Sequence, residues 1–259
     1  TTKNGSSMMA FRLPQEAPAG FLLTASHSDS PCFRLRDHAE LTGEYIRLSA
    51  ERYGGMINDS WLDRPLSVAG RVVVRREGGL EARLVDLKRD VALIPRVAIH
   101  LDRETNNGVK YDPARDLVAL YAAGTGSGSF YREVARTADC APEDVVAGDL
   151  VLYNNQPGTV WGPEGEFVSA PRLDDLACVF ACTEGFLTAQ ERDMVPVLCV
   201  FDNEEIGSET KQGAASVFLP ETLAAISEAL GLSAADHRAL LADSMMLSCD
   251  NGHARHPNH

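Results

Sequence analysis

Lysine is scarce in this sequence, and acidic residues outnumber basic ones. The 259 residues include 24 Lys and Arg against 37 Asp and Glu, which leaves a formal net charge of −13. Proteins that bind nucleic acid carry a basic face, and proteins that adhere to anionic membranes carry runs of basic residues. The composition therefore argues against a nucleic-acid partner and against a membrane partner.

Long apolar runs and paired cysteines are also missing. No apolar run approaches the roughly 18 residues that a membrane-spanning helix needs, and the first residues lack the charged-then-apolar pattern of a secretion signal. We therefore expect a cytoplasmic protein. The 6 cysteines include no Cys-x-x-Cys pair, and most lie among apolar residues. This pattern indicates reduced core cysteines rather than disulfides or thiolate zinc ligands.

The most informative stretch is residues 197–208, an apolar run that leads into acidic residues. Such a run is typical of a strand buried on both faces of an α/β sheet, and ligands bind beyond the carboxyl ends of these strands. Glu204 and Glu205 lie at this end. Because adjacent carboxylates repel each other, they need a compensating charge, and a divalent metal ion is a common one. A solvated acidic turn is the alternative interpretation.

Similar side chains stand at three other places where a predicted strand ends or a predicted helix begins. They are His27 with Asp29, Asp174 with Asp175, and Asp250 with His253. In a doubly wound sheet the strand ends meet at one edge, so these groups can converge on the two glutamates. Nitrogen and oxygen ligands of this kind suit zinc, cobalt or manganese. Two such ions with a free glutamate as general base form a hydrolytic site, although acidic strand ends are also common without any metal.

The chain changes character between residues 70 and 166, where β segments dominate. They include a hairpin over 71–87 and a short segment over 97–101. We expect residues 70–166 to form an inserted β-rich domain, and residues 1–69 and 167–259 to form one discontinuous α/β domain. The α/β part is predicted to contain helices over 173–190, 212–219, 222–230 and 234–242, with Pro220 as a break and Ser233 as an N-cap.

Several short motifs resemble those of the aspartyl aminopeptidase family. Four of them contain the candidate ligands: residues 27–32, 172–176, 202–208 with 212–214, and 250–254 with 256–258. The others are residues 2–7, 53–55, 61–64 and 98–101. The motifs follow one another in the family's order, so the resemblance covers nearly the whole chain.

This resemblance implies a zinc-exopeptidase-like fold, in which helices sandwich a mixed α/β sheet. It implies a metal-dependent aminopeptidase that removes N-terminal residues, preferably Asp or Glu, from peptides with free N-termini. The implied cofactors are two divalent metal ions, with Zn²⁺ expected first and Co²⁺ or Mn²⁺ as the other candidates.

The resemblance also implies a role for each motif residue. His27 and Glu205 would bind one metal ion, Asp250 would bind the second, and Asp174 would bridge both. Glu204 would be the general base that takes a proton from the bridging water. Asp29 would accept a hydrogen bond from the His27 ring and fix its tautomer. Related enzymes have a cis peptide bond after the bridging Asp, so we expect a cis bond between Asp174 and Asp175.

The predicted domain of residues 70–166 resembles the family's dimerisation domain, although it is short for one. His100 matches a histidine that, in the family, reaches into the partner subunit's active site and helps to hold the substrate carbonyl. A packed histidine at a strand edge is the alternative. The resemblance thus implies a homodimer, which in the family assembles further into a dodecamer.

Three features depart from the family pattern. The sequence begins inside the pattern, and it ends before the family's last metal-binding histidine and before the basic residue that reads the acidic side chain. We therefore interpret it as an excerpt of a longer enzyme or as a truncated relative, and expect no activity from these residues alone. The pair Asn251–Gly252 replaces a Met-Ala-like pair, and we expect this change to be harmless.

Two other functions remain open. One is a dinuclear metal deacylase or amidohydrolase, which accepts N-acylated substrates. The other is an inactive family member that serves as an assembly subunit, although the presence of Glu204 argues against it.

Overall fold

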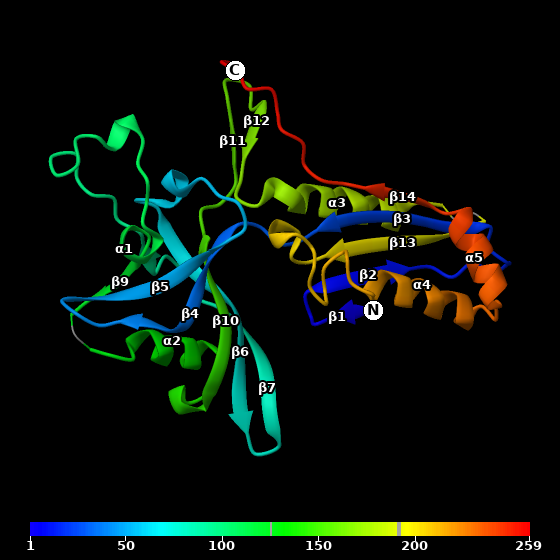
Figure 1. Cartoon of the computed structure of the whole chain (residues 1–259), viewed down its shortest axis with the longest axis horizontal. Coiled ribbons are helices and arrows are strands. Elements are labelled where there is room, and N and C mark those ends of the chain that lie inside the picture. The colour runs from blue at the N-terminus through cyan, green and yellow to red at the C-terminus, as the bar shows by residue number, and fades with distance from the viewer. Residues whose placement is uncertain (125, 191–192) are drawn as a thin grey trace. The chain divides into compact units, whose positions relative to one another are not determined.

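The computed structural model describes residues 1–124, 126–190 and 193–259. The chain divides into two compact units, which we call the α/β unit (Thr1–Ser30 with Arg172–His259) and the β unit (Pro31–Pro171) (Figure 1). The first segment of the α/β unit therefore ends at Ser30, whereas residue 69 was predicted. The reason is that residues 32–53 form two strands that pair within the sheet of the β unit.

The α/β unit is built on a five-stranded mixed sheet with the order β1-β2-β13-β3-β14. Its strands are β1 (Thr2–Lys3), β2 (Ser7–Phe11), β3 (Gly20–His27), β13 (Met194–Phe201) and β14 (Met245–Ser248). Strands β13 and β14 both run parallel to β3, whereas β2 is antiparallel to β13. The strand predicted at residues 195–201 is therefore confirmed, and it lies in the centre of the sheet.

Helices cover both faces of this sheet, as Figure 1 shows. They are α3 (Leu173–Thr188), α4 (Phe218–Ala229) and α5 (Ala234–Ala242). Alternate residues of β13 point to opposite faces, so Val197 and Cys199 pack with α4 and α5, while Leu198 and Val200 pack with α3. A mixed α/β sheet sandwiched by helices was predicted, and it is confirmed.

The β unit contains a seven-stranded sheet with the order β10-β4-β5-β9-β8-β6-β7. Its strands are β4 (Cys32–Leu41), β5 (Tyr45–Tyr53), β6 (Pro65–Arg76), β7 (Gly79–Asp86), β8 (Ala92–Leu93), β9 (Ala119–Ala123) and β10 (Val145–Asn154). Because β10 pairs with β6 as well as with β4, the strand pairings close into a circuit around a core. The predicted hairpin is confirmed as β6 and β7.

Smaller elements complete the β unit. They are α1 (Pro113–Asp116), α2 (Ser129–Thr137), the paired strands β11 (Thr159–Trp161) and β12 (Phe167–Ser169), and 3₁₀ turns at Asn58–Trp61, Thr105–Asn107 and Pro142–Asp144. Helix α2 packs against the core of the unit through the buried side chains of Phe130 and Val134.

Two predicted elements are wrong. Residues 212–217 form turns, and helix α4 begins only at Phe218. Pro220 lies in the first turn of α4, where N–H groups have no partner within the helix, so the missing N–H of proline costs no hydrogen bond. Residues 97–101 contain a turn rather than a strand, with the Leu101 N–H bonded to the Ala98 carbonyl oxygen at 2.8 Å.

Two expectations about composition can also be compared with the structure. The cysteines Cys32, Cys140, Cys178, Cys182, Cys199 and Cys249 are all free thiols. Among the described residues, no helix has both the length and the apolar character needed to cross a membrane.

Candidate metal centre

Three strand ends meet at one edge of the sheet in the α/β unit. Because β13 is parallel to β3 with Phe201 opposite His27, the residues that follow Phe201 emerge beside His27. Strand β14 is also parallel to β3 with Ser248 opposite Ala25, so Asp250 emerges at the same edge. The sequence positions are far apart, but the parallel register brings their side chains together.

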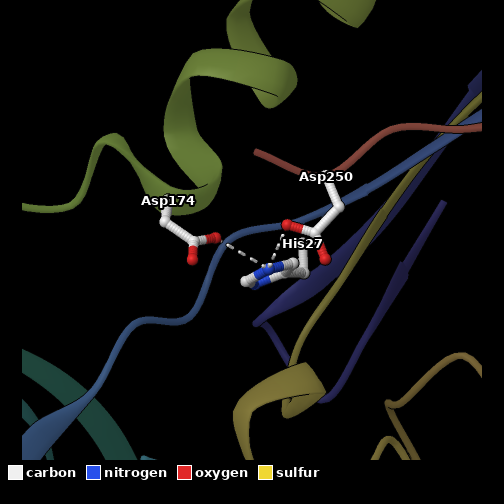
Figure 2. A group of neighbouring side chains, drawn as sticks. All are labelled: His27, Asp174 and Asp250. Atoms are coloured by element: carbon white, nitrogen blue, oxygen red, sulfur yellow. Dashed lines mark ion pairs between the residues drawn. The ribbon is translucent and has the colours of Figure 1, made fainter. Parts of the chain in front are cut away.

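His27, Asp174 and Asp250 form a compact group of potential metal ligands (Figure 2). One ligand atom from each residue lies within 4.8 Å of the other two. His27 Nε2 is 3.4 Å from Asp174 Oδ1 and 3.9 Å from Asp250 Oδ1. The His27 ring is buried, whereas the side chains of Asp174 and Asp250 are 59% and 57% exposed. The group is therefore anchored on one side and open to solvent on the other.

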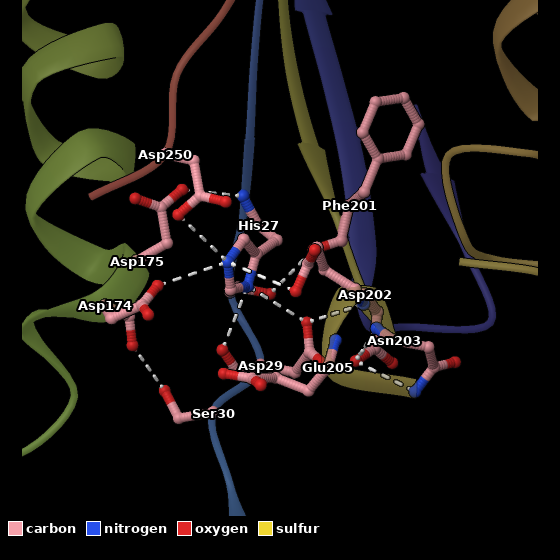
Figure 3. Close-up of polar contacts among 12 residues, drawn as sticks. His27, Asp29, Ser30, Asp174, Asp175, Phe201, Asp202, Asn203, Glu205 and Asp250 are labelled. Atoms are coloured by element: carbon pink, nitrogen blue, oxygen red, sulfur yellow. Dashed lines mark hydrogen bonds and ion pairs between the residues drawn. The ribbon is translucent and has the colours of Figure 1, made fainter. Parts of the chain in front are cut away.

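Asp29 holds both the histidine and the glutamate segment (Figure 3). His27 Nδ1 lies 3.1 Å from the Asp29 carbonyl oxygen and 3.3 Å from its Oδ1. The two carboxylate oxygens of Asp29 accept the backbone N–H groups of Glu204 and Glu205 at 3.1 and 3.2 Å. With Nδ1 facing Asp29, Nε2 is the ring atom that faces Asp174 and Asp250.

The two aspartates at the start of α3 point in different directions. Their peptide bond is cis, as the resemblance implied. Asp175 is buried, and its Oδ2 accepts the backbone N–H of His27 at 3.1 Å. Asp174 faces the ligand group, and its carbonyl oxygen accepts the Ser30 hydroxyl at 2.9 Å. Asp175 thus ties α3 to β3 while Asp174 remains available as a ligand.

Glu204 and Glu205 lie in a 3₁₀ turn, Glu204–Ile206, that follows β13. The turn is framed by residues in the left-handed region, Asn203 with φ 66° and Gly207 with φ 98°. Glu204 Oε2 is 3.8 Å from His27 Nε2. Glu205 is half-buried and is not one of the three residues of the ligand group found among the described residues.

The carboxylates at this edge perturb one another and the histidine. Burial and the nearby charges of Asp174 and Asp29 raise the pKa of Glu205 to about 7. Burial, followed by the charge of Asp250, raises the pKa of Asp174. Burial lowers the pKa of His27, but the surrounding carboxylates, Asp29 first, outweigh it and the net shift is upward. The edge therefore concentrates negative charge that a cation would offset.

The donors at this edge fit a zinc-type ion. Imidazole nitrogen together with carboxylate oxygen is one of the ligand combinations found in catalytic zinc sites. A metal-binding histidine usually has its other ring nitrogen hydrogen-bonded to a carboxylate or a carbonyl oxygen, and Asp29 offers both to His27 Nδ1. His253, which the sequence placed at the same strand end, is exposed and is not part of the ligand group.

A contact between the first strands and the segment after the glutamates was not predicted. The Ser7 hydroxyl, which is buried, donates to the Gln212 carbonyl oxygen at 2.6 Å. A Cβ on Gly213 would lie 2.0 Å from the Ser208 carbonyl oxygen, so only glycine fits there. The motifs at residues 2–7 and 212–214 contain these residues, but the spacing of the motifs in the sequence does not show that Ser7 contacts Gln212.

His100 belongs to the other unit of the chain. It lies in an exposed turn of the β unit. Its predicted contact is with the active site of a second subunit, and this remains a prediction.

Comparisons with known proteins show the family to which this chain belongs. The profile of the family described as aminopeptidase I zinc metalloprotease (M18) matches residues 1–259. A probable M18 family aminopeptidase 2 from Clostridium acetobutylicum is 39% identical over 268 residues, which cover 99% of this chain and 61% of that protein.

Two solved structures show the same fold. A chain of the Ape4 and Nbr1 complex has a TM-score of 0.93 at 32% identity and covers 100% of this chain and 55% of its own. The mApe1 dodecamer of S. cerevisiae has a TM-score of 0.83 at 29% identity and covers 99% of this chain and 60% of its own. This chain therefore spans about 61% of the length of the first curated relative. Because the family profile matches every residue, the chain belongs to the M18 family of zinc metalloproteases, the aminopeptidase I family.

Proposed function

We propose that this chain is the metal-binding part of a zinc aminopeptidase that hydrolyses the N-terminal peptide bond of peptides. The observation that carries the proposal is the convergence of His27, Asp174 and Asp250 at the carboxyl edge of the sheet. The activity belongs to the protein as a whole, since this chain spans about 61% of a curated relative.

His27, Asp174, Asp250 and Glu205 are the proposed ligands of two divalent ions, with Asp174 shared between them. Zn²⁺ is the expected ion, and the donor set also suits Co²⁺ or Mn²⁺. When bound, such ions make water nucleophilic at neutral pH and stabilise negative charge on a carbonyl oxygen. Asp29 orients the imidazole, and its hydrogen bonds to the Glu204 and Glu205 amides hold the glutamates at the edge.

Glu204 is the proposed general base. Its side chain is 47% exposed, and Oε2 lies 3.8 Å from His27 Nε2. The carboxylate is therefore close to the ligand group and accessible to water. In this position Glu204 takes a proton from the attacking water and passes it to the leaving amine.

The proposed substrates are peptides with a free N-terminus and preferably an acidic first residue. The acidic preference follows from the resemblance to aspartyl aminopeptidases. With a net charge of −13, the overall field of the chain does not attract such substrates. Their recognition must come from local cations, namely the metal ions and nearby Arg or Lys.

We further propose a homodimer that assembles into a larger homo-oligomer in the cytoplasm. The similarity to a dodecameric aminopeptidase supports assembly. Residues 70–166, which fall within the β unit, are the proposed dimerisation region, and His100 is the residue proposed to reach the partner's active site.

The test uses the full-length protein that contains this chain. We expect it to hydrolyse Asp- and Glu-anilides and to leave their N-acetyl forms intact. Removal of metal with a chelator should abolish hydrolysis, and added Zn²⁺ should restore it. Hydrolysis of the N-acetyl forms instead would favour a deacylase. Full activity after complete metal removal would refute the proposal.

A further inference from the structure

The side-chain amide of Asn251 faces the start of α3, immediately after Asp250 in the sequence. Its Nδ2 donates to the Leu173 carbonyl oxygen, and its Oδ1 accepts from Cys178 Sγ at 3.8 Å. Because a carbonyl oxygen only accepts hydrogen bonds, the amide nitrogen must be the atom that faces Leu173. The amide therefore spans from the end of β14 to the residue that precedes Asp174.

The partner thiol belongs to the same polar cluster. The neighbouring Asp175 carboxylate, followed by burial, raises the pKa of Cys178 to about 12, so the thiol stays protonated at neutral pH and keeps its one hydrogen for Asn251 Oδ1. Asp175 in turn accepts the His27 backbone N–H. Asn251 thus connects the segment that carries Asp250 to helix α3, and Asp175 separately connects α3 to His27, without using the atoms that face the ligand group.

Asp250 needs an anchor of this kind. Strand β14 ends at Ser248, and the Cys249 N–H still bonds to the Ala25 carbonyl oxygen at 2.7 Å. Asp250 itself lies beyond these contacts with β3, in a segment without regular structure. The next contact along the chain is made by the Asn251 side-chain amide, which bonds to Leu173 and Cys178 of α3.

We propose that Asn251 is a positioning residue that holds the Asp250 carboxylate beside Asp174 and so sets the metal affinity of the site. The inference rests on the proposed function, because it takes the ligand group as a metal site. It differs from the expectation that Asn251–Gly252 is a harmless departure from the family pattern, and the experiment below decides between the two. Only the fold brings the amide within reach of Leu173 and Cys178.

The test compares zinc affinity in the full-length protein and its variants by competition with a chelating dye. Asn251→Leu removes both hydrogen bonds at similar volume, and we expect it to weaken zinc binding by about 10-fold, the lower end for groups that orient metal ligands. Asn258→Leu is the matched control in the same exposed segment, and it should bind zinc like the wild type. Cys178→Ala should weaken binding, whereas Cys178→Ser, which keeps a donor, should restore it.

The melting temperature of the metal-free protein is measured in parallel, and we expect it to be equal in the wild type and Asn251→Leu. A loss of affinity matched by a fall in this temperature would assign Asn251 a purely structural role and overturn the inference. Wild-type affinity in Asn251→Leu would overturn it while leaving the proposed function standing. A wild-type protein that binds no zinc would overturn both.

Discussion

Asp29 connects two segments that lie far apart in the sequence, the end of β3 and the turn that contains Glu204 and Glu205. Its carboxylate accepts the backbone N–H groups of Glu204 and Glu205, and the same residue faces His27 Nδ1. The Asp29 side chain is 7% exposed, so its carboxylate is largely shielded from solvent although the Glu204 end of the contact is exposed. One buried carboxylate thereby sets the direction of the imidazole and the position of both glutamates.

Replacing Glu204 by Gln should separate proton transfer from metal binding. The amide keeps the shape of the side chain but accepts no proton, so turnover in the full-length protein should fall by about 100- to 10,000-fold. Zinc content should stay at the wild-type level. The exposed Glu209, changed to Gln, is the control and should leave turnover unchanged. If Glu204→Gln retains full turnover, the general base is another residue.

A partly buried carboxylate in the β unit, Glu133, should make the stability of that unit sensitive to acid. Glu133 has a side chain only 12% exposed, and it accepts hydrogen bonds from the Tyr121 hydroxyl at 2.6 Å and from Arg89. Burial raises the pKa of Glu133, but these two donors outweigh it and the net shift is downward. A lowered folded-state pKa stabilises the protein above the unfolded-state pKa, and this contribution is lost as pH falls through the folded-state value.

The free energy of unfolding should therefore decrease on acidification below about pH 4.5. Glu133→Gln should flatten that decrease, as measured by denaturant unfolding at a series of pH values. Glu77→Gln, at an exposed position in the same unit, should retain the wild-type slope. An unchanged slope in Glu133→Gln would show that other carboxylates dominate the acid response.

At the scale of elements, the segment after the glutamates shows how a tertiary contact overrides a local pattern. Apolar spacing predicted a helix over residues 212–219, but Gly213 packs directly on the Ser208 backbone and Gln212 accepts the Ser7 hydroxyl. These contacts require a tight turn. By contrast, the helix predicted over residues 234–242 is confirmed, because Ser233 and Asp236 form a capping box within the segment itself.

Two glycine-to-alanine changes should shift the free energy of unfolding in opposite directions. At Gly213 the new Cβ would lie 2.0 Å from the Ser208 carbonyl oxygen, and overpacking of this kind destabilises proteins by about 1–3 kcal/mol. At Gly185 in helix α3 the Cβ meets no atom within 4 Å, so the higher helix propensity of alanine should stabilise by about 0.5–1 kcal/mol. Urea unfolding of both variants measures the difference. Equal stabilities would contradict the close approach at Gly213.

At the scale of the whole molecule, the two units have separate cores. The α/β unit carries the ligand group and the glutamates, while the β unit closes its own strand circuit around a separate core. The exposed His100 belongs to the β unit. If His100 acts in the active site of the partner subunit, mixing two inactive variants should restore activity.

The full-length variants His100→Ala and Glu204→Gln should each be nearly inactive. If His100 acts in the partner's site, random mixed dimers contain one site with both residues intact, so mixing should recover roughly a quarter of wild-type activity. Refolding the two variants together and assaying hydrolysis measures this recovery. The variants refolded separately and then combined are the control. No recovery in the mixture would place His100 outside the partner's site.

The sequence by itself determined the local elements and the identity of the chemistry-bearing residues. The apolar strand before Glu204, the capped helix at residues 234–242 and the hairpin of β6 and β7 are encoded in short-range patterns, so they were predictable. The motifs around His27, Asp174 and Asp250 were recognisable because each is a short run of unusual residues.

Only the tertiary structure decided which of these residues meet. The parallel register of β3, β13 and β14 brings His27, Glu204 and Asp250 to one edge, and strand pairing between distant segments moves the first unit boundary to Ser30. The same packing places Asn251 against Leu173 and Cys178. Short patterns carry no information on contacts between distant segments, because those contacts depend on how the strands align in the finished sheet.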